Sequence, residues 1–254
     1  MARPKAITSL KEAGPNEGKG SKNWLIYSDP GIGKTTLMGT APKSLFLTVE
    51  AAGTESARAL GSQSDELVVP TWKEFGEAYL WLEAEGHLEY DWVLPDSITE
   101  LEEICWNDQL ESSGREYVAQ IQDYGIVDKK IKKMVDRFHR LPINVCWSAH
   151  MMGLEMEDED GDDIIKRLPK IGRPKNGAPL SHLVCGKTTL NGLLIVVEDD
   201  DGDELRRLWV HGNEKFVAKD RHDTFNKYVD APNIADMATA VDKRRSGTKK
   251  KKGK

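Results

Sequence analysis

Apolar residues gather in five short, uninterrupted runs that are separated by longer mixed stretches. The runs cover residues 23–27, 44–50, 91–96, 143–150 and 192–197. Uninterrupted apolar runs of this length are typical of strands that are buried on both faces of a parallel sheet. The pattern therefore predicts five buried strands.

The stretches between these runs have the periodicity of helices. Residues 72–86 and 100–114 follow the second and third runs, and in 128–141 the apolar positions Ile131, Met134, Val135 and Phe138 share one helical face. Strands that alternate with helices predict an α/β fold with a mostly parallel sheet flanked by helices. We expect a flexible segment at 1–22, one domain at 23–235 and a basic disordered tail at 236–254.

Two acidic runs, 155–163 and 198–204, resemble calcium-binding loops at first sight. The calcium-loop pattern needs an acid five residues before the glycine and another at its twelfth position. Met156 and Val197 occupy the first of these positions, and Arg167 and Leu208 occupy the second. Both runs are therefore interpreted as exposed turns, and the second one predicts a β-hairpin near the C-terminal end of the domain.

Composition excludes several classes of protein. Three cysteines that lie far apart, Cys105, Cys146 and Cys185, argue against a disulfide scaffold and against a cysteine-based zinc site. No apolar run approaches the roughly 20 residues of a membrane helix, and the N-terminus has no apolar signal region. We therefore expect a cytoplasmic protein with no membrane partner.

The charge is distributed unevenly. The chain has 254 residues and a net charge of −6, but residues 243–254 contain eight Lys or Arg and no acid. Removing these eight charges leaves −14 on the rest of the chain. A block of like charge is usually a solvated tail, and the alternative is a tether for the phosphates of nucleic acids.

A glycine-rich segment follows the first apolar run. Residues 28–35 match the phosphate-loop pattern G-x-x-x-x-G-K-[ST] except at the first position, where serine replaces glycine. The context is a strand followed by a helix, which the pattern requires. The residues that we expect to bind a nucleotide are Ser28, Asp29, Pro30, Gly31, Ile32, Gly33, Lys34, Thr35 and Thr36.

A second copy of the G-K-T triplet lies in residues 181–188. Its bulky residues His182, Leu183 and Val184 stand where a phosphate loop needs a permissive backbone. We therefore expect no nucleotide at the second copy.

Carboxylates at the ends of other strands complete the predicted site. Asp96 closes the third run and is the expected Mg²⁺ ligand together with Thr35, while Lys34 is expected to reach the β- and γ-phosphates of ATP. Pro95 is awkward there, because it cannot donate to a sheet ladder.

The residue after Asp96 is Ser97, so the carboxylate that activates water must lie elsewhere. Glu50 closes the second run and is our candidate, with Glu100 and Glu55 as alternatives. His150 closes the fourth run and is the candidate sensor of the γ-phosphate.

Together these motifs resemble the RecA-like ATPases, which have a phosphate loop, a Glu ending the next strand, a strand ending in D-S and a polar sensor. Here those are SDPGIGKTT, LTVE, VLPDSIT and CWSAH. Over residues 20–225 the chain is most similar to the phage Sak-four group of single-strand annealing ATPases, which IQDYG and AKDRHD also resemble.

The resemblance implies an oligomer, as a ring or a filament. Lys219 and Arg221 resemble a K-x-R motif that reaches the nucleotide of the neighbouring subunit. The resemblance also implies a phage-type role in DNA recombination in the host cytoplasm, with single-stranded DNA and a single-stranded-DNA-binding or recombination protein as partners.

A basic stretch after the fourth run is the candidate DNA-binding loop, since its Pro and Gly content predicts irregular structure. Its cations are Lys166, Arg167, Lys170, Arg173 and Lys175. Two alternatives to a DNA-stimulated ATPase stay open. One is a nucleotide-gated binding or loading module with little turnover, and the other is a P-loop NTPase that acts on a substrate other than DNA.

Overall fold

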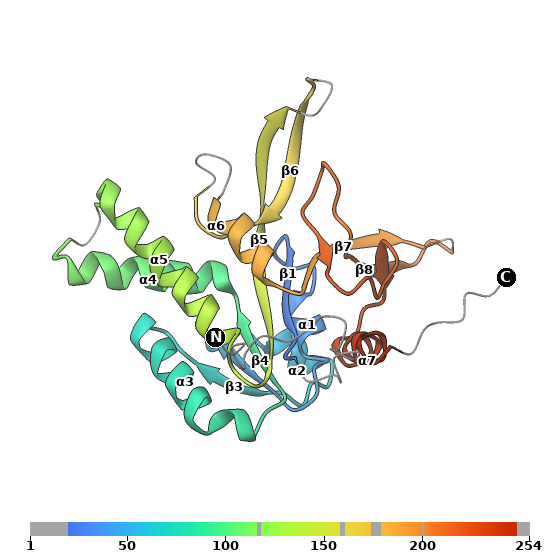
Figure 1. Cartoon of the computed structure of the whole chain (residues 1–254), viewed down its shortest axis with the longest axis horizontal. Helices are drawn as coiled ribbons and strands as arrows, with labels where there is room; N and C mark the ends of the chain where they lie inside the picture. Colours follow the sequence, from blue (N-terminus) through green and yellow to red (C-terminus); the bar gives the residue numbers. More distant parts are fainter. Residues whose placement is uncertain (1–19, 116–117, 158–160, 174–178, 200, 248–254) are drawn as a thin grey trace, which may run out of the picture.

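The five predicted strands form the centre of a larger sheet. A computed structural model describes residues 20–115, 118–157, 161–173, 179–199 and 201–247 (Figure 1). Within these residues, the sheet order is β10-β8-β7-β1-β5-β4-β2-β3, with β6 paired to β5 and β9 paired to β7. The strands are β1 (Asn23–Ser28), β2 (Ser44–Thr48), β3 (Asp65–Val68), β4 (Trp92–Asp96), β5 (Asn144–Glu157), β6 (Asp163–Pro169), β7 (Leu190–Glu198), β8 (Glu204–Trp209), β9 (Lys219–Asp220) and β10 (Tyr228–Asp230).

Pairing is parallel from β7 across β1, β5, β4 and β2 to β3, and antiparallel where β8, β10, β6 and β9 join. The predicted mostly parallel α/β fold and the C-terminal hairpin, β7–β8, are therefore confirmed. Because parallel strands run in the same direction, the last residues of β1, β2 and β4 lie at one end of the sheet, together with His150 of β5, the register partner of Ser28.

Helices cover both faces of this sheet (Figure 1). They are α1 (Lys34–Met38), α2 (Glu55–Ala59), α3 (Trp72–Ala84), α4 (Ile98–Ser112), α5 (Ile121–Phe138), α6 (Pro179–Lys187) and α7 (Ile234–Arg245), with a 3₁₀ turn at Gly86–Leu88. The first core cluster joins α3, α4, α5 and α6 to one face, and the second joins α1, α2 and α7 to the other. Along β1, Leu25 and Tyr27 belong to the first cluster and Trp24 and Ile26 to the second.

Two parts of the chain differ from the sequence-based expectation. Lys166 and Arg167, expected in an irregular loop, lie in β6, which pairs with the extended end of β5 in register. The expectation was wrong because the prolines and glycines that suggested a loop begin at Pro169, which is the last paired residue of β6.

The second difference concerns the predicted tail at 236–254. Residues up to Arg245 form α7, whose apolar side is buried in the second core cluster. The buried Lys22 ammonium also forms an ion pair with Asp242 of this helix. The basic end of α7 masked its apolar positions in the sequence, so the folded part of the chain extends past the predicted boundary.

Pro95 fits into the central strand β4 because the hydrogen-bond ladder between β4 and β5 ends before it. The β4–β5 ladder covers only Trp92 and Val93, so Pro95 lies beyond its end, opposite Leu47 of β2. The missing N–H of proline therefore leaves the ladder to β5 intact. None of the helices in the described residues is long and apolar enough to cross a membrane.

Gly192 lies in β7 directly against the buried Leu208 of β8, and a Cβ added to it would lie 2.5 Å from Leu208 Cδ1. We expect Gly192→Ala to lower the free energy of unfolding by about 1–3 kcal/mol, because an overpacked core must shift. Gly125 of α5 is the control, since a Cβ there meets nothing within 4 Å. Urea denaturation should show a stability gain of up to about 1 kcal/mol for Gly125→Ala, and an unchanged midpoint for Gly192→Ala would contradict the packing argument.

Candidate functional site

The segment that joins β1 to α1 has the backbone of a phosphate loop. Gly31 has φ of 80° and Gly33 has φ of 104°, in the left-handed region that glycine adopts without strain. Successive backbone N–H groups in such turns form a concave site for anions. The structure thus gives residues 28–33 the conformation that the motif requires.

Lys34 is buried, with 7% of its surface exposed. Its ammonium contacts only neutral oxygens, namely the carbonyl and hydroxyl oxygens of Ser28 at 3.3 Å each and the carbonyl oxygen of Asp29 at 3.2 Å. Burial lowers the pKa of Lys34, and the nearby carboxylates of Asp96, Asp29 and Glu100 counteract that effect. Among the described residues no carboxylate forms an ion pair with this ammonium, so an anion of a ligand fits beside it.

Asp96 joins three elements at the same edge of the sheet. Thr35 Oγ1 donates to Asp96 Oδ2 at 2.6 Å, and Ser148 Oγ of β5 donates to Asp96 Oδ1. Thr35 is thus held by the strand-end carboxylate that the sequence predicted as its partner. Ser148 was missed, because a buried serine inside an apolar run carries no signal of its own.

His150 and Glu100 lie next to this cluster. His150 Nε2 is 3.6 Å from Glu100 Oε1, and His150 Nδ1 is buried with no hydrogen-bond partner among the described residues. Burial and the charge of Asp96 raise the pKa of Glu100, while His150 counteracts this effect. The free Nδ1 can bind an oxygen of a ligand, as expected for a sensor.

Glu50 lies two residues past β2, and its side chain is exposed. Thr48, the last residue of β2, is the register partner of Asp96. Glu50 is therefore at the end of the sheet where Thr35, Asp96 and Ser148 meet. In the described contacts, however, the carboxylate beside His150 is that of Glu100 and not that of Glu50. Glu55 begins α2 and is exposed.

The second G-K-T copy is helical, since residues up to Lys187 form α6. Lys187 pairs with Asp136 of α5 rather than facing a loop. The structure thus lacks a phosphate loop at this copy, as the sequence predicted.

Lys219 and Arg221 point to the same side, as their spacing predicts. Lys219 Nζ donates to the carbonyl oxygens of Cys185 and Gly186 at 2.6 and 3.1 Å, and Arg221 Nη2 donates to that of Gly186 at 3.0 Å. Both cations thus lie at the C-terminal end of α6, where unpaired carbonyls attract positive charge. They also lie beside the first residues of β7, at the end of the parallel strands opposite the chain's own phosphate loop.

The predicted DNA-binding residues are only partly gathered. Lys170 and Arg173 follow β6, whereas Lys175 lies outside the described residues. The Arg173 guanidinium lies 3.8 Å from the centre of the Tyr124 ring and 5.7 Å from that of Trp106. These rings come from α5 and α4, so no local sequence signal could reveal them.

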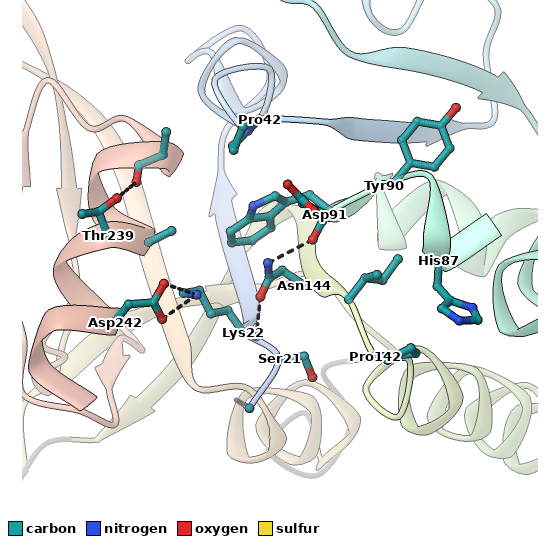
Figure 2. A pocket seen from close by; sticks show the side chains of 15 residues that line it. Ser21, Lys22, Pro42, His87, Tyr90, Asp91, Pro142, Asn144, Thr239 and Asp242 are labelled. Carbon is teal, nitrogen blue, oxygen red and sulfur yellow. Dashed lines mark hydrogen bonds and ion pairs between the residues drawn. The ribbon is translucent and has the colours of Figure 1, made fainter. Parts of the chain in front are cut away.

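A cavity of about 530 Å³ lies where the parallel strands begin, at the end of the sheet opposite the phosphate loop (Figure 2). It is bordered by the ion pair of Lys22 with Asp242 and by the hydrogen bonds of Asn144 at the start of β5. Its place beside the first residues of β4 and β5 separates it from the phosphate loop, so it takes no part in the site described above.

The residues at the phosphate loop fit ATP with Mg²⁺. The buried ammonium of Lys34 and the loop backbone suit phosphate oxygens, and the oxygens of Thr35 and Asp96 are the hard ligands that Mg²⁺ prefers. No group of three His, Cys, Asp or Glu side chains within the described residues could bind a metal by itself. Mg²⁺ commonly takes one or two protein ligands and completes its shell with phosphates and water.

A protein-family model described as an AAA domain matches residues 21–222, from the start of β1 past β9. The chain belongs to the AAA domain family. With the observed phosphate loop, this shows an AAA-type P-loop ATPase domain on an α/β fold.

One solved structure similar to this AAA domain is a KaiC-like protein from the hyperthermophilic archaeon Pyrococcus horikoshii OT3. The two are 12% identical, with a TM-score of 0.40 over 78% of this chain and 81% of the other. No curated protein matches the chain.

The two candidate carboxylates can be separated by substitution. If Glu50 is the base that takes a proton from the attacking water, Glu50→Gln should keep ATP binding and lose about a hundredfold or more in turnover. Glu100→Gln should have a smaller effect, because its carboxylate already pairs with His150. Single-turnover hydrolysis checks this, and the reverse ranking would assign the base to Glu100.

Proposed function

We propose that this AAA domain hydrolyses ATP in a phage-type DNA recombination or single-strand annealing reaction and binds single-stranded DNA. One observation carries the nucleotide part of the proposal. A buried ammonium, that of Lys34, has only neutral partners and lies between a phosphate loop and a Thr35–Asp96 pair. A triphosphate with Mg²⁺ supplies the charges that this arrangement lacks.

Each residue then has a defined task. Thr35 and Asp96 would hold Mg²⁺, which would supply neutralisation of the phosphate charge. Ser148 keeps the Asp96 carboxylate oriented through its hydrogen bond. Lys34 attracts the terminal phosphates. His150 Nδ1 forms a hydrogen bond with the γ-phosphate or with the attacking water. Glu50, exposed two residues past β2, takes the proton of the attacking water.

The DNA part rests on Arg173 and its aromatic neighbours. Single-stranded nucleic acid is bound without sequence preference by cations that follow its backbone and by flat groups on which bases stack. Arg173, Tyr124 and Trp106 provide both kinds of group. Further cations lie on the solvent side of α5, around a hollow of about 340 Å³ formed by Lys129, Lys132, Lys133, Asp136, Arg137 and Arg140.

The first turns of α4 connect the segment before Arg173 to the nucleotide site. Thr99 Oγ1 donates to the carbonyl oxygen of Lys170 and accepts from the backbone N–H of His150, at 2.9 and 3.0 Å. Gly172 N donates to Glu102 Oε2 at 2.7 Å. The first turns of α4 therefore contact both the ATP cluster and the segment that precedes Arg173, which supports a DNA-stimulated reaction over a pure binding module.

We expect Lys34→Ala to lower ATP turnover at least a hundredfold, because the charge on the transferred phosphate loses its buried cation. Lys187→Ala, in the second G-K-T copy, is the matched control and should stay within about twofold of the unmodified protein. Release of inorganic phosphate, measured with and without single-stranded DNA, should also show stimulation by DNA.

Arg173→Ala separates the two parts of the proposal. It should abolish the stimulation by DNA while leaving the basal rate intact, since the contacts of Arg173 within the described part of the chain are with Tyr124 and Trp106, which lie outside the nucleotide site. Equal turnover in Lys34→Ala and the unmodified protein would refute the ATPase assignment. Stimulation that survives in Arg173→Ala would refute this DNA surface.

We further propose that Lys219 and Arg221 act on the nucleotide of a neighbouring subunit in a ring or filament. They lie far from their own phosphate loop, so only a second copy can bring them to one. A recombination protein or a single-stranded-DNA-binding protein of the same phage is the expected partner of such an assembly in the host cytoplasm.

Mixing two inactive variants tests the shared site. Arg221→Ala keeps its phosphate loop and Lys34→Ala keeps its K-x-R motif, so mixed interfaces can combine the intact halves. Turnover should therefore rise above that of either variant alone. If subunit exchange is demonstrated and turnover does not rise, or if a monomer is fully active, the shared site is excluded.

A further inference from the structure

Arg206 of β8 lies against the phosphate loop of its own chain. Its Nε donates to the carbonyl oxygen of Ile32 at 2.8 Å. A Cβ added to Gly33 would lie 2.4 Å from the same nitrogen, so the guanidinium covers the side of Gly33 where a side chain would stand. Residues 32 and 206 are 174 positions apart, and nothing in the sequence signals this contact.

The sheet order shows which end of the site Arg206 faces. The order runs β8-β7-β1-β5-β4, and β1 carries the phosphate loop. Asp96 on β4 and His150 on β5, which serve the reacting phosphate in the proposed function, lie on one side of β1. Arg206 lies on the other side. A nucleoside triphosphate has its reacting phosphate at one end and its base at the other, so the base and ribose extend toward the β7–β8 hairpin.

The guanidinium is available at this position. Arg206 is exposed, and its guanidinium forms a hydrogen bond to the described residues only through Nε. Both terminal nitrogens of the guanidinium are therefore unpaired among these residues. An Arg side chain with one nitrogen fixed presents a rigid plane, and such planes stack on aromatic rings. The bond to Ile32 thus holds a flat cation beside the phosphate loop, on the β8 side of β1.

We propose that Arg206 forms the base-binding end of the ATP site, with its guanidinium plane stacked on the purine ring. This inference rests on the proposed ATP binding. Stacking of this kind holds any purine, since every base has a flat face. Arg206 therefore adds affinity for nucleotides over inorganic phosphates and does not distinguish ATP strongly from GTP.

The neighbouring Arg207 is the natural control. It lies on the other side of β8, where it forms a two-bond ion pair with Asp230 at 2.5 and 3.0 Å and covers the Tyr228 ring at 3.9 Å. Both arginines belong to the same strand, so a general loss of charge or of hairpin stability affects both variants. A loss specific to the base affects only Arg206.

The test compares Mg²⁺-ATP with inorganic tripolyphosphate, which carries phosphates and no base, by titration calorimetry. Arg206→Ala should weaken ATP binding about fivefold to tenfold and change tripolyphosphate binding less than twofold. Arg206→Lys, which keeps the charge but loses the plane, should fall between Arg206→Ala and the unmodified protein for ATP. Arg207→Ala should bind both ligands normally.

Equal weakening of both ligands by Arg206→Ala would overturn the inference, because Arg206 would then act on the loop or the phosphates. Unchanged ATP binding would overturn it as well. If the unmodified protein binds tripolyphosphate but not ATP, the base site is refuted while the phosphate loop stands. If it binds neither ligand, the proposed function fails and this inference with it.

Discussion

Lys34 brings a positive charge into a part of the protein that water barely reaches, and the surrounding structure compensates for that burial. Three carboxylates from different elements, Asp96, Asp29 and Glu100, act on the ammonium and oppose the effect of burial on its pKa. None of them contacts it directly among the described residues, so the compensation is partial. A buried charge without a contacting counterion is costly, and a bound phosphate relieves that cost. The loop is thus built for an anionic ligand before any ligand arrives.

The parallel strands bring these groups together. Ser28 pairs with His150 in register, and Thr48 pairs with Asp96. The phosphate loop, His150 and Asp96 therefore lie at the same end of the sheet, because β1, β2 and β4 end there and β5 leaves its pairing with β1 there. At the opposite end of the sheet, near the beginnings of β1 and β4, the buried rings of Trp24 and Trp92 pack against each other with their centres 5.1 Å apart.

Much of this arrangement could be predicted from the sequence, because it depends on local patterns. Uninterrupted apolar runs predicted β1, β2, β4, β5 and β7, and the position of Asp96 at the end of such a run predicted that it shares a site with Thr35, to which it is hydrogen-bonded. Contacts between distant segments could not be predicted in this way. Arg206 against Ile32, Ser148 against Asp96 and Arg173 against Tyr124 each join residues with no shared motif.

The errors have physical causes too. Pro169 ends β6, and the prediction extended its effect backward over residues that are paired with β5. The edge strand β3 was missed because its side chains are mostly exposed and its pattern is not apolar. In α7 the cluster of cations at the last turn favours the helix through its dipole, whereas in the sequence it suggested a disordered tail.

His150 occupies the point at which β5 changes partners. It is the last residue of β5 paired with β1, and the next residue, Met151, begins the antiparallel ladder with β6. Beyond that point the two strands project from the body of the molecule as a ribbon (Figure 1). A two-stranded ribbon twists and bends more easily than the sheet that it leaves. A bend at the base of the ribbon would therefore act on the backbone next to His150, so the ribbon and the residues around Asp96 and Glu100 share one attachment point.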